Sequence, residues 1–220
     1  MSLPSGVWRS FFPLLVLLVI IARAPHLSAQ SARPSEQRWE VFEQLGASFF
    51  TFTNSQTVTI IPLPSGTPIT FREDTSYPAR ARLFTGVRFH VTPNNHIELS
   101  YSYTSLRRQT TISAPISGSP FFAFESLGSH ITSVNYVRNL WRRGRLQPFV
   151  TGGLGVATIT SDVDTFSTPT GNVGAGFDLR LKRVLSLRIE NRVYLRRLVE
   201  IYSRQIVTNV APSVGLVFHF

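Results

Sequence analysis

The sequence contains no cysteine among its 220 residues, and acidic residues are few, with 12 Asp and Glu against 22 Lys and Arg. The missing cysteines exclude a disulfide framework and any chemistry that depends on a thiol. After Ile21 no apolar run approaches the roughly 20 residues that a helix needs to cross a bilayer. The sequence has no phosphate-binding loop and no cluster of metal ligands, so we predict neither a metal nor an organic cofactor. Hydrogen bonding and packing alone must therefore hold the fold.

The first residues have the three parts of a secretory signal peptide. Arg9 lies in a short leading region, an apolar run covers residues 11–21, and small residues precede Ala29. This run is shorter than a membrane-spanning helix requires, which makes an uncleaved anchor the less favoured alternative. We predict a signal peptide over residues 1–29 and one mature domain over residues 30–220.

Beyond residue 55 the dominant pattern is an alternation of apolar and polar residues, which is typical of β-strands. In the segment 184–196, for example, Leu187 and Ile189 share one face, while Arg188 and Glu190 share the other. The apolar residues of the first predicted strand, 39–53, do not alternate cleanly between the two faces. The pattern predicts an all-β chain of eight strands, at residues 39–53, 80–92, 96–104, 128–139, 147–160, 171–182, 184–196 and 205–220.

The predicted links between strands differ in length on alternate sides. The short links are at residues 93–95, 140–146 and 182–183, and the long links are at residues 54–79, 106–121, 161–170 and 197–204. Outer-membrane barrels have such an asymmetry, with short periplasmic turns and long outer loops. A soluble eight-stranded ligand-binding barrel, the alternative fold, has no reason for it. Because a membrane protein without spanning helices must close a barrel, we predict an eight-stranded antiparallel up-and-down transmembrane β-barrel.

If the apolar faces of the strands contact lipid, the polar faces line the interior. An eight-stranded barrel is narrow enough for side chains to fill it. We therefore interpret the inward charges as a plug of ion pairs and hydrogen bonds. A narrow pore for small solutes is the alternative, and it would favour anions because the inward arginines outnumber the acids. The predicted lumen charge network is Arg82, Arg88, Glu98, Asp178, Arg180, Arg188, Glu190 and Arg192.

Several segments resemble a known family of small outer-membrane barrels. Residues 147–156 (QPFVTGGLGV) and 172–180 (NVGAGFDLR) are similar to strands of OmpA-like and OmpX-like barrels. The resemblance implies an outer-membrane location and a monomer, with outer-membrane lipid, lipopolysaccharide, periplasmic chaperones and the barrel-assembly machinery as partners. It also implies that the peptidoglycan-binding domain of longer OmpA relatives is absent. The last strand resembles the C-terminal signal that the assembly machinery reads, with one face formed by Val214, Leu216, Phe218 and Phe220.

Some barrels of this kind act on lipid A, using a histidine and a hydroxyl on the lipid-facing surface. Here His130 and Thr132 share a face, and Glu125 or Asp178 is a conceivable carboxylate. Lipid A deacylases have Ser where this chain has Thr, and no Glu stands at the expected downstream position. A hydroxyl nucleophile needs an oriented base and a third group. We therefore predict no enzymatic activity and interpret His130 as a rim or interfacial residue.

The excess of positive charge does not predict nucleic-acid binding, because the arginines lie on inward faces or near links. Five of them flank long links, and we expect them to contact lipopolysaccharide phosphates: Arg107, Arg108, Arg196, Arg197 and Arg204. The predicted function is a structural, adhesion or loop-mediated binding role in the outer membrane. A narrow pore is the second hypothesis, and a lipid A-modifying enzyme is the third.

Overall fold

The computed structural model describes residues 38–50, 53–60, 69–113, 121–141, 144–161, 164–200 and 203–220. Over these ranges the chain forms ten β-strands. The same ranges contain no helix with the length and apolarity to cross a membrane. The predicted signal peptide, residues 1–29, lies outside the described residues.

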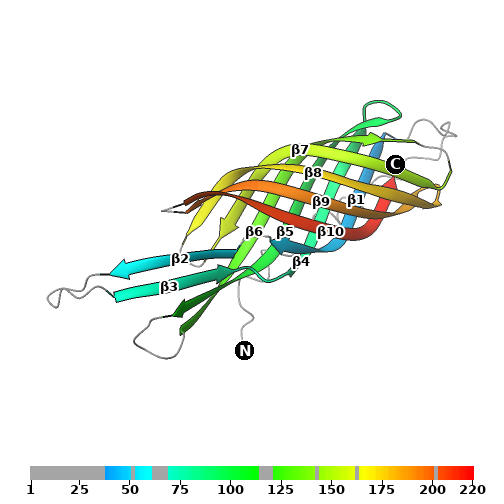
Figure 1. Ribbon diagram of the computed structural model, residues 1–220. Helices are drawn as coiled ribbons and strands as arrows, with labels where there is room; N and C mark the ends of the chain where they lie inside the picture. The colour runs from blue at the N-terminus through cyan, green and yellow to red at the C-terminus, as the bar shows by residue number, and fades with distance from the viewer. Residues whose placement is uncertain are drawn as a thin grey trace, which may run out of the picture. The chain divides into compact units, whose positions relative to one another are not determined.

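Eight of the strands close an antiparallel barrel (Figure 1). Each pairs with its neighbour along the chain, and β10 returns to pair with β1. At this closure the backbone N–H of Phe220 donates to the carbonyl of Trp39 at 2.9 Å. The predicted eight-stranded up-and-down barrel is therefore confirmed, with the strands β1 (Trp39–Phe50), β4 (Arg80–His90), β5 (Asn95–Ser113), β6 (Phe121–Asn139), β7 (Leu146–Thr160), β8 (Thr165–Lys182), β9 (Leu185–Glu200) and β10 (Ser203–His219).

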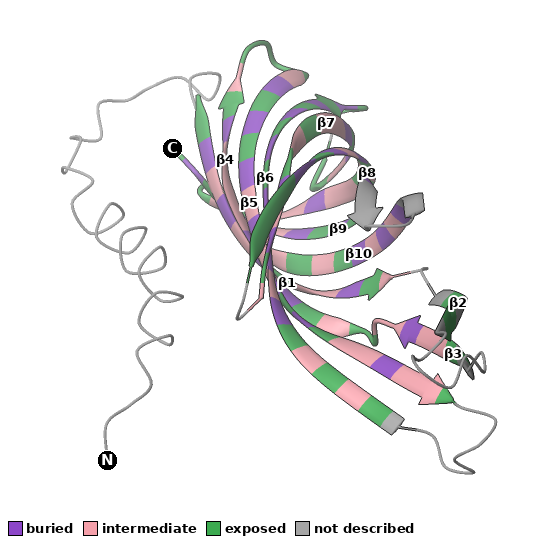
Figure 2. Ribbon diagram, turned by 90° about the vertical axis from the view of Figure 1, so that its left-hand side faces the viewer, coloured by how far each residue is buried: buried purple, intermediate pink, exposed green. Residues whose placement is uncertain are grey.

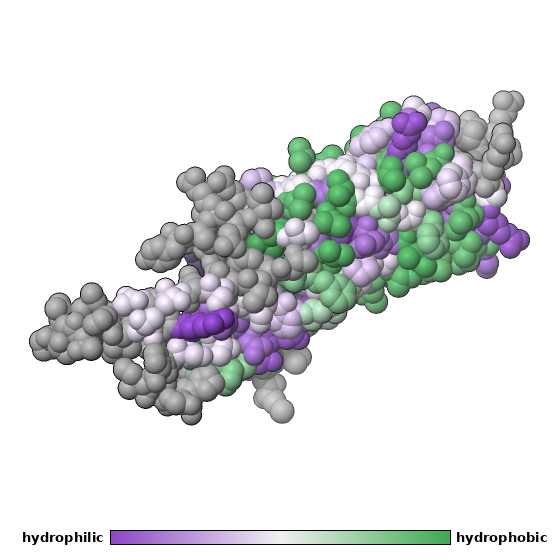
Figure 3. Space-filling view, viewed as in Figure 1, coloured by the Kyte–Doolittle hydropathy of each residue, from purple (hydrophilic) through white to green (hydrophobic). Residues whose placement is uncertain are grey.

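The two faces of the barrel wall have opposite chemistry. Buried and exposed residues alternate along each barrel strand (Figure 2). The side chains of Glu98 and Arg188 are fully buried inside, whereas Leu45 and Leu154 are 66% and 76% exposed. Hydrophobic residues gather over the barrel in the space-filling view (Figure 3). This distribution is the reverse of that in a soluble protein, where burial of apolar side chains drives folding.

Three of the predicted long links are much shorter than expected. Strand β5 continues to Ser113 and β6 begins at Phe121, so most of the predicted link 106–121 is paired strand. In the same way β8 begins at Thr165, and β9 and β10 extend to Glu200 and from Ser203. The predicted loops at 106–121 and 161–170 were wrong because segments with several Thr and Ser residues were interpreted as irregular, although threonine is β-branched and favours strands once a partner strand is available. The link 197–204 contains no threonine, and its residues pair where β9 and β10 extend as a ladder.

The fourth predicted long link, residues 54–79, contains a hairpin of two strands, β2 (Thr53–Ile60) and β3 (Ile69–Ser76). Strand β1 correspondingly ends at Phe50 rather than at the predicted residue 53. Residues 72–76 of β3 pair with residues 109–113 of β5, which also pairs with β6. These segments form one four-stranded sheet that continues the barrel wall (Figure 1). We call β2, β3, residues 109–113 of β5 and residues 121–124 of β6 the projecting sheet.

Candidate functional site: the ion-pair network of the barrel interior

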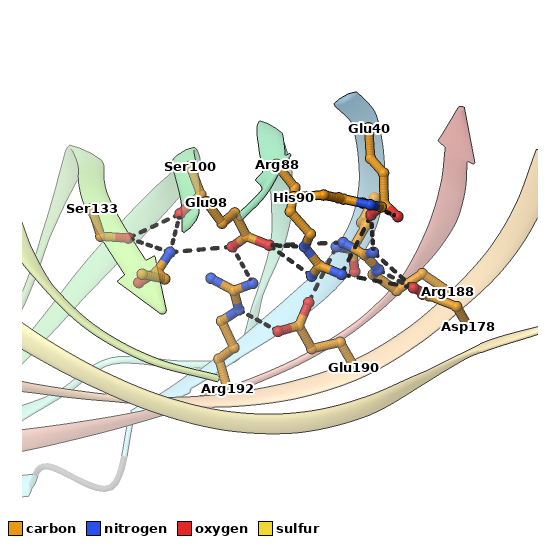
Figure 4. Close-up of polar contacts among 12 residues, drawn as sticks. Glu40, Arg88, His90, Glu98, Ser100, Ser133, Asp178, Arg188, Glu190 and Arg192 are labelled. Atoms are coloured by element: carbon orange, nitrogen blue, oxygen red, sulfur yellow. Dashed lines mark hydrogen bonds and ion pairs between the residues drawn. The ribbon is translucent and has the colours of Figure 1, made fainter. Parts of the chain in front are cut away.

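Glu98 on β5 is the centre of a polar network inside the barrel (Figure 4). Its Oε2 accepts hydrogen bonds from Nη2 and Nε of Arg88 at 2.8 and 3.2 Å. Its Oε1 accepts from Nη2 of Arg192 at 2.6 Å and from Nδ2 of Asn135 at 3.1 Å. One carboxylate thus joins side chains from β4, β6 and β9, which lie on different sides of the barrel.

Asp178 and Arg188 form a bidentate pair across the β8–β9 ladder, on the side of Glu98 that faces the β8–β9 turn. Nε and Nη2 of Arg188 donate to the two carboxylate oxygens of Asp178 at 2.7 and 2.8 Å. Arg188 also lies 3.4 Å from Oε2 of Glu40, and so does Nη1 of Arg88. Two parallel hydrogen bonds between a guanidinium and a carboxylate fix both groups in one geometry. The pair therefore connects β1, β4, β8 and β9 into one rigid layer.

Glu40 is a member of this network that the sequence interpretation missed. Besides the two arginines, its Oε1 contacts Nε2 of His90 at 2.8 Å and Nδ1 of His219 at 3.2 Å. Glu40 shares its inward face with Phe42 and Gln44, which are also buried. The sequence interpretation missed Glu40 because the apolar Phe42 lies on the same inward face as Glu40 and Gln44. The even-numbered positions 40 and 44 of β1 are nevertheless polar, as on the inward faces of the other strands.

A second branch of the network runs along β9. Nε of Arg192 donates to Oε1 of Glu190, whose other oxygen accepts from Nε2 of Gln44 at 3.3 Å. Oγ of Ser213 then donates to Oε1 of Gln44 at 2.7 Å. On the other side, Nδ2 of Asn172 donates to Oδ1 of Asn135 at 2.8 Å. Hydrogen bonds thus extend from β1 and β10 to β6 and β8 across the interior.

The network nearly balances its own charge. It contains four carboxylates, Glu40, Glu98, Asp178 and Glu190, against three arginines, Arg88, Arg188 and Arg192, with two histidines on Glu40. Aromatic rings complete the packing, because the guanidinium carbons of Arg88 and Arg188 lie 5.0 and 5.1 Å from the ring of Phe149. Within the described ranges no group of His, Asp or Glu is arranged to hold a metal ion. Such an arrangement binds strands together and fills the interior; it leaves no free ligand set.

Of the eight residues predicted for the lumen network, seven are nine-tenths or more buried. Six of them belong to the network described above. Arg82 is buried closer to the projecting sheet, where its Nη2 donates to Oγ of Ser102 at 2.6 Å. Arg180 is half-buried near the β8–β9 turn, and its Nη2 donates to the carbonyl of Arg183 at 3.5 Å.

The predicted lipopolysaccharide contacts divide into different groups. Arg196 was placed wrongly, because its side chain is 5% exposed and points inward, over the ring of Phe50 at 5.2 Å. Arg196 is four residues after the inward-facing Arg192, and alternate residues of a continuous strand point to the same face. Arg196 therefore also points inward. Arg107 is exposed and stacks on Phe124 at 4.4 Å, and Arg108 pairs with Glu125 at 3.5 Å. The side chains of two further residues lie outside the described part of the chain, Arg197 and Arg204.

His130 lies on the outer surface of the barrel, half-buried between tyrosines. Its Nδ1 lies 2.8 Å from Oη of Tyr101, and its ring packs against that of Tyr103 at 5.0 Å. Asp178 is inside the barrel with Arg188, and Glu125 pairs with Arg108. The two carboxylates considered as partners of His130 are thus engaged elsewhere. Among the residues that the structure describes, no carboxylate joins His130 and the hydroxyl of Tyr101 at this position.

The four residues of the predicted assembly signal lie on the outer face of β10 and at its end. They belong to the strand that closes the barrel against β1, in a register that pairs Val214 with Leu45 and Phe218 with Val41. All four side chains are exposed: Val214, Leu216, Phe218 and Phe220.

No protein-family model and no curated protein matches the sequence. Among solved structures, Neisserial surface protein A is similar, with a TM-score of 0.51 and 10% identity, over 84% of this chain and 98% of that chain. The outer membrane protein AlkL aligns with a TM-score of 0.47 and 15% identity, over 88% and 94% of the two chains. The N-terminal β-barrel domain of Pseudomonas aeruginosa OprF aligns with a TM-score of 0.42 and 14% identity, over 84% and 98%. At 10% identity the likeness to Neisserial surface protein A establishes the fold alone, which is that of a small outer-membrane barrel.

Proposed function

We propose that this chain is an outer-membrane barrel that spans the bilayer, is closed to solutes, and presents the projecting sheet outside the cell for binding or adhesion. The observation that carries the proposal is the continuation of the barrel wall into a paired four-stranded sheet, at the end of the barrel where residues 51–79 form the long connection between β1 and β4. A barrel that served only to span the membrane needs no such extension. The outer location follows from the rule that long connections of these barrels face outward.

The outer face of the barrel supports a location in the bilayer. Large apolar side chains on it are half or more exposed, among them Leu99, Val134, Leu154 and Val173. Monomeric soluble proteins rarely expose contiguous apolar patches of this kind, because water disfavours them. Apolar side chains are stable in contact with the hydrocarbon of a bilayer. Because the barrel is closed, the backbone hydrogen-bonding groups of its strands are paired and are not exposed to lipid.

The projecting sheet differs from the barrel wall in chemistry and fits an aqueous location. Ser55, Thr57 and Thr59 on β2 are exposed, as is Thr70 on β3. On the same hairpin, a hydrogen bond from Ser55 and the neighbouring Arg72 lower the pKa of Asp74 below its ordinary value. Exposed Phe122 and Phe124 add two apolar contact points on β6. A polar surface with a few aromatic residues is the composition that protein-binding surfaces favour.

The polar interior supports closure to solutes and disfavours the pore hypothesis. The ion-pair network crosses the lumen from β1 to β6. Towards the projecting sheet a second obstruction follows, a cluster of buried apolar side chains from four strands: Leu106, Leu127, Ile159 and Val207. Opening a path would break several buried ion pairs, each of which costs several kcal/mol to disrupt.

The location of the hairpin can be tested by labelling, because the chain has no cysteine of its own. Thr59→Cys on β2 is expected to react with a membrane-impermeant maleimide on intact cells. Asn94→Cys, in the exposed β4–β5 turn, is the matched control and is expected to react only after the outer membrane is permeabilised. Labelling of Asn94→Cys but not of Thr59→Cys on intact cells would contradict the proposed orientation.

The binding role and a purely structural role are separated by a variant in which a short Gly-Ser turn replaces residues 53–76. We expect this chain to migrate as a compact band on an unheated gel, because the barrel strands remain. In a strain lacking the gene, it is expected to restore resistance to detergent but not attachment of cells to a surface. Restoration of both phenotypes would leave the projecting sheet without a role and would refute the binding part of the proposal.

Two of the arginines near the projecting sheet remain candidates for lipopolysaccharide contact. Arg107 and Arg108 lie on β5 and pair with β6 next to the projecting sheet, and both side chains are accessible. A guanidinium binds a phosphate through paired, charge-assisted hydrogen bonds. We propose that they contact lipopolysaccharide phosphates. Assembly by the barrel machinery, delivery by periplasmic chaperones and the monomeric state belong to the same proposal.

A further inference from the structure

We propose that the outer surface of β5 and β6 binds the phosphorylated sugars of one lipopolysaccharide molecule, between the apolar part of the barrel surface and the projecting sheet. The two strands run side by side from the barrel wall into that sheet (Figure 1). The site rests on the proposed function, because it requires this end of the barrel to lie in the outer leaflet. It extends the proposed contact at Arg107 to a defined set of residues that includes His130.

The outer face of β5 changes from apolar through aromatic and polar to charged in the direction of the projecting sheet. In that order its outward-facing residues are Leu99, Tyr101, Tyr103, Ser105 and Arg107. Tyrosine rings favour the level at which acyl chains meet headgroups, so the boundary of the hydrocarbon lies near the two tyrosines. A phosphorylated membrane lipid presents the same order of groups, with its acyl chains inward and its hydroxyl and phosphate groups outward.

His130 provides a hydrogen-bonding group just outside this boundary. Its Nδ1 lies 2.8 Å from Oη of Tyr101, and when that phenol donates, the ring proton lies on Nε2. Among the described residues none forms a hydrogen bond with Nε2. A Cβ at Gly128 would lie 3.4 Å from Nε2 and 3.8 Å from Cε2 of Tyr103, so the missing side chain leaves a gap between these two rings. A sugar hydroxyl in this gap would accept from Nε2.

Arg107 provides the charge that recognises a phosphate. Its guanidinium carbon lies 4.4 Å from the ring of Phe124, which supports one side of the exposed side chain. Among the described residues no carboxylate pairs with Arg107, whereas the neighbouring Arg108 pairs with Glu125. A guanidinium stacked on an aromatic ring keeps its N–H groups free and oriented, and paired N–H groups match two phosphate oxygens. Arg107 is therefore the principal phosphate contact of this site.

The dimensions of the polar surface favour phosphorylated sugars over the headgroup of a phospholipid. Tyr103 and Arg107 are four residues apart on β5, a separation of about 13 Å along the strand. Linked sugars that carry a phosphate cover this distance, whereas a single glycerophosphate is shorter. The polar surface also extends sideways from His130, because Thr158 lies opposite it on β7 and contacts Ser167 on β8 at 2.9 Å between their hydroxyl oxygens. Hydroxyl-rich surfaces of this width suit a saccharide.

The test is lipid binding by the full chain refolded in a zwitterionic detergent, followed by native mass spectrometry and by the imidazole resonances of His130. Intact lipopolysaccharide, dephosphorylated lipopolysaccharide and phosphatidylglycerol are added separately. We expect saturable binding of one intact lipopolysaccharide molecule, together with a shift of the His130 resonances. The other two lipids are expected to bind about tenfold more weakly, because one lacks the phosphates and the other lacks the sugars.

Two variants examine the two halves of the site. Arg107→Gln is expected to weaken lipopolysaccharide binding by about tenfold, because it removes the charge-assisted hydrogen bonds. Gly128→Val places a β-branched side chain beside Nε2 of His130 and is expected to weaken binding and reduce the His130 shift. Arg138→Gln is the matched control, since Arg138 is an exposed arginine on the outer face of β6 at the opposite end of the barrel. It should bind as the unmodified chain does.

The site is overturned if the unmodified chain binds no lipopolysaccharide saturably, a result that needs no variant to fold. It is also overturned if either of the other lipids binds as tightly, or if Arg107→Gln or Gly128→Val binds as the unmodified chain does. These results leave the proposed function standing as long as Thr59→Cys reacts on intact cells. Weaker binding by Arg138→Gln but not by Arg107→Gln would place the lipid at the other end of the barrel and would overturn both proposals.

Discussion

Replacement of Glu98 by Gln is the most direct test of the interior network. Gln keeps the volume of the side chain and one acceptor oxygen, so the change removes charge without creating a cavity. Glu98 is fully buried and accepts hydrogen bonds from Arg88 at 2.8 Å and Arg192 at 2.6 Å. Nη1 of Arg188 lies 3.8 Å from the same carboxylate, so the substitution weakens the ion pairs of three buried guanidinium groups.

The size of the effect follows from these contacts. Breaking a buried ion pair by removing one partner costs about 3–5 kcal/mol. Arg88 keeps Glu40 at 3.4 Å and Arg192 keeps Glu190, which offsets part of the loss. We expect Glu98→Gln to lower the free energy of unfolding by about 3 kcal/mol, the lower end of that range.

The assay is urea unfolding of the chain refolded into lipid vesicles, followed by tryptophan fluorescence and by the mobility of the unheated band on a gel. Glu125→Gln is the matched control, because Glu125 pairs with Arg108 at 3.5 Å while both side chains are 39% exposed. Such an exposed pair contributes about 0–1 kcal/mol and is weakened by salt, whereas a buried pair is screened much less. If Glu98→Gln costs no more than Glu125→Gln, the interior is hydrated and the plug interpretation is refuted.

Three further predictions concern packing, conduction and lipid contact. Gly86→Ala is expected to destabilise the barrel by about 1–3 kcal/mol in the same urea assay, because its Cβ would lie 2.5 Å from Cζ of Phe42 and from the carbonyl oxygen of Leu99. Gly171→Ala, where the nearest atoms would be 3.9 Å away, is the control, and equal losses would contradict the packing argument. In planar bilayers the chain is expected to show no large steady conductance, and a stable nanosiemens channel would refute the closed lumen. Replacing Arg107 and Arg108 by Gln is expected to slow refolding in lipopolysaccharide-containing vesicles but not in vesicles without it; identical rates in both would exclude the proposed contact.

The alternation of side chains was sufficient to predict the barrel and most of its interior. Along β9 the residues Arg188, Glu190 and Arg192 fall on one face simply because successive strand residues point to opposite sides. The same rule also places Arg196 inside, and only the assumption that the strand ended there led to the wrong prediction. Glu40 was missed for a different reason. Phe42 lies on the same inward face, so the polar and apolar residues of β1 do not separate cleanly in the sequence.

The length of the strands beyond the bilayer was not predictable in this way. Thr- and Ser-rich segments are compatible with a loop or with a strand, and their state depends on whether a partner strand is within reach. Residues 109–113 of β5 form a strand between β3 and β6, which supply hydrogen bonds on both edges. The hairpin of β2 and β3 therefore depends on pairing between segments far apart in the sequence.

The sequence by itself determined the class of fold, because a period of two with apolar and polar faces has few solutions when no spanning helix is present. It also determined most of the charges that face inward, whereas Glu40 on β1 and Arg196 on β9 were recognised only in the tertiary structure. Only the tertiary structure decided which of them meet, since the curvature and register of eight strands set the distances across the lumen. That arrangement places three arginines around Glu98, whereas no carboxylate in the described part of the chain pairs with Arg82. Alternation along a single strand could not predict this difference.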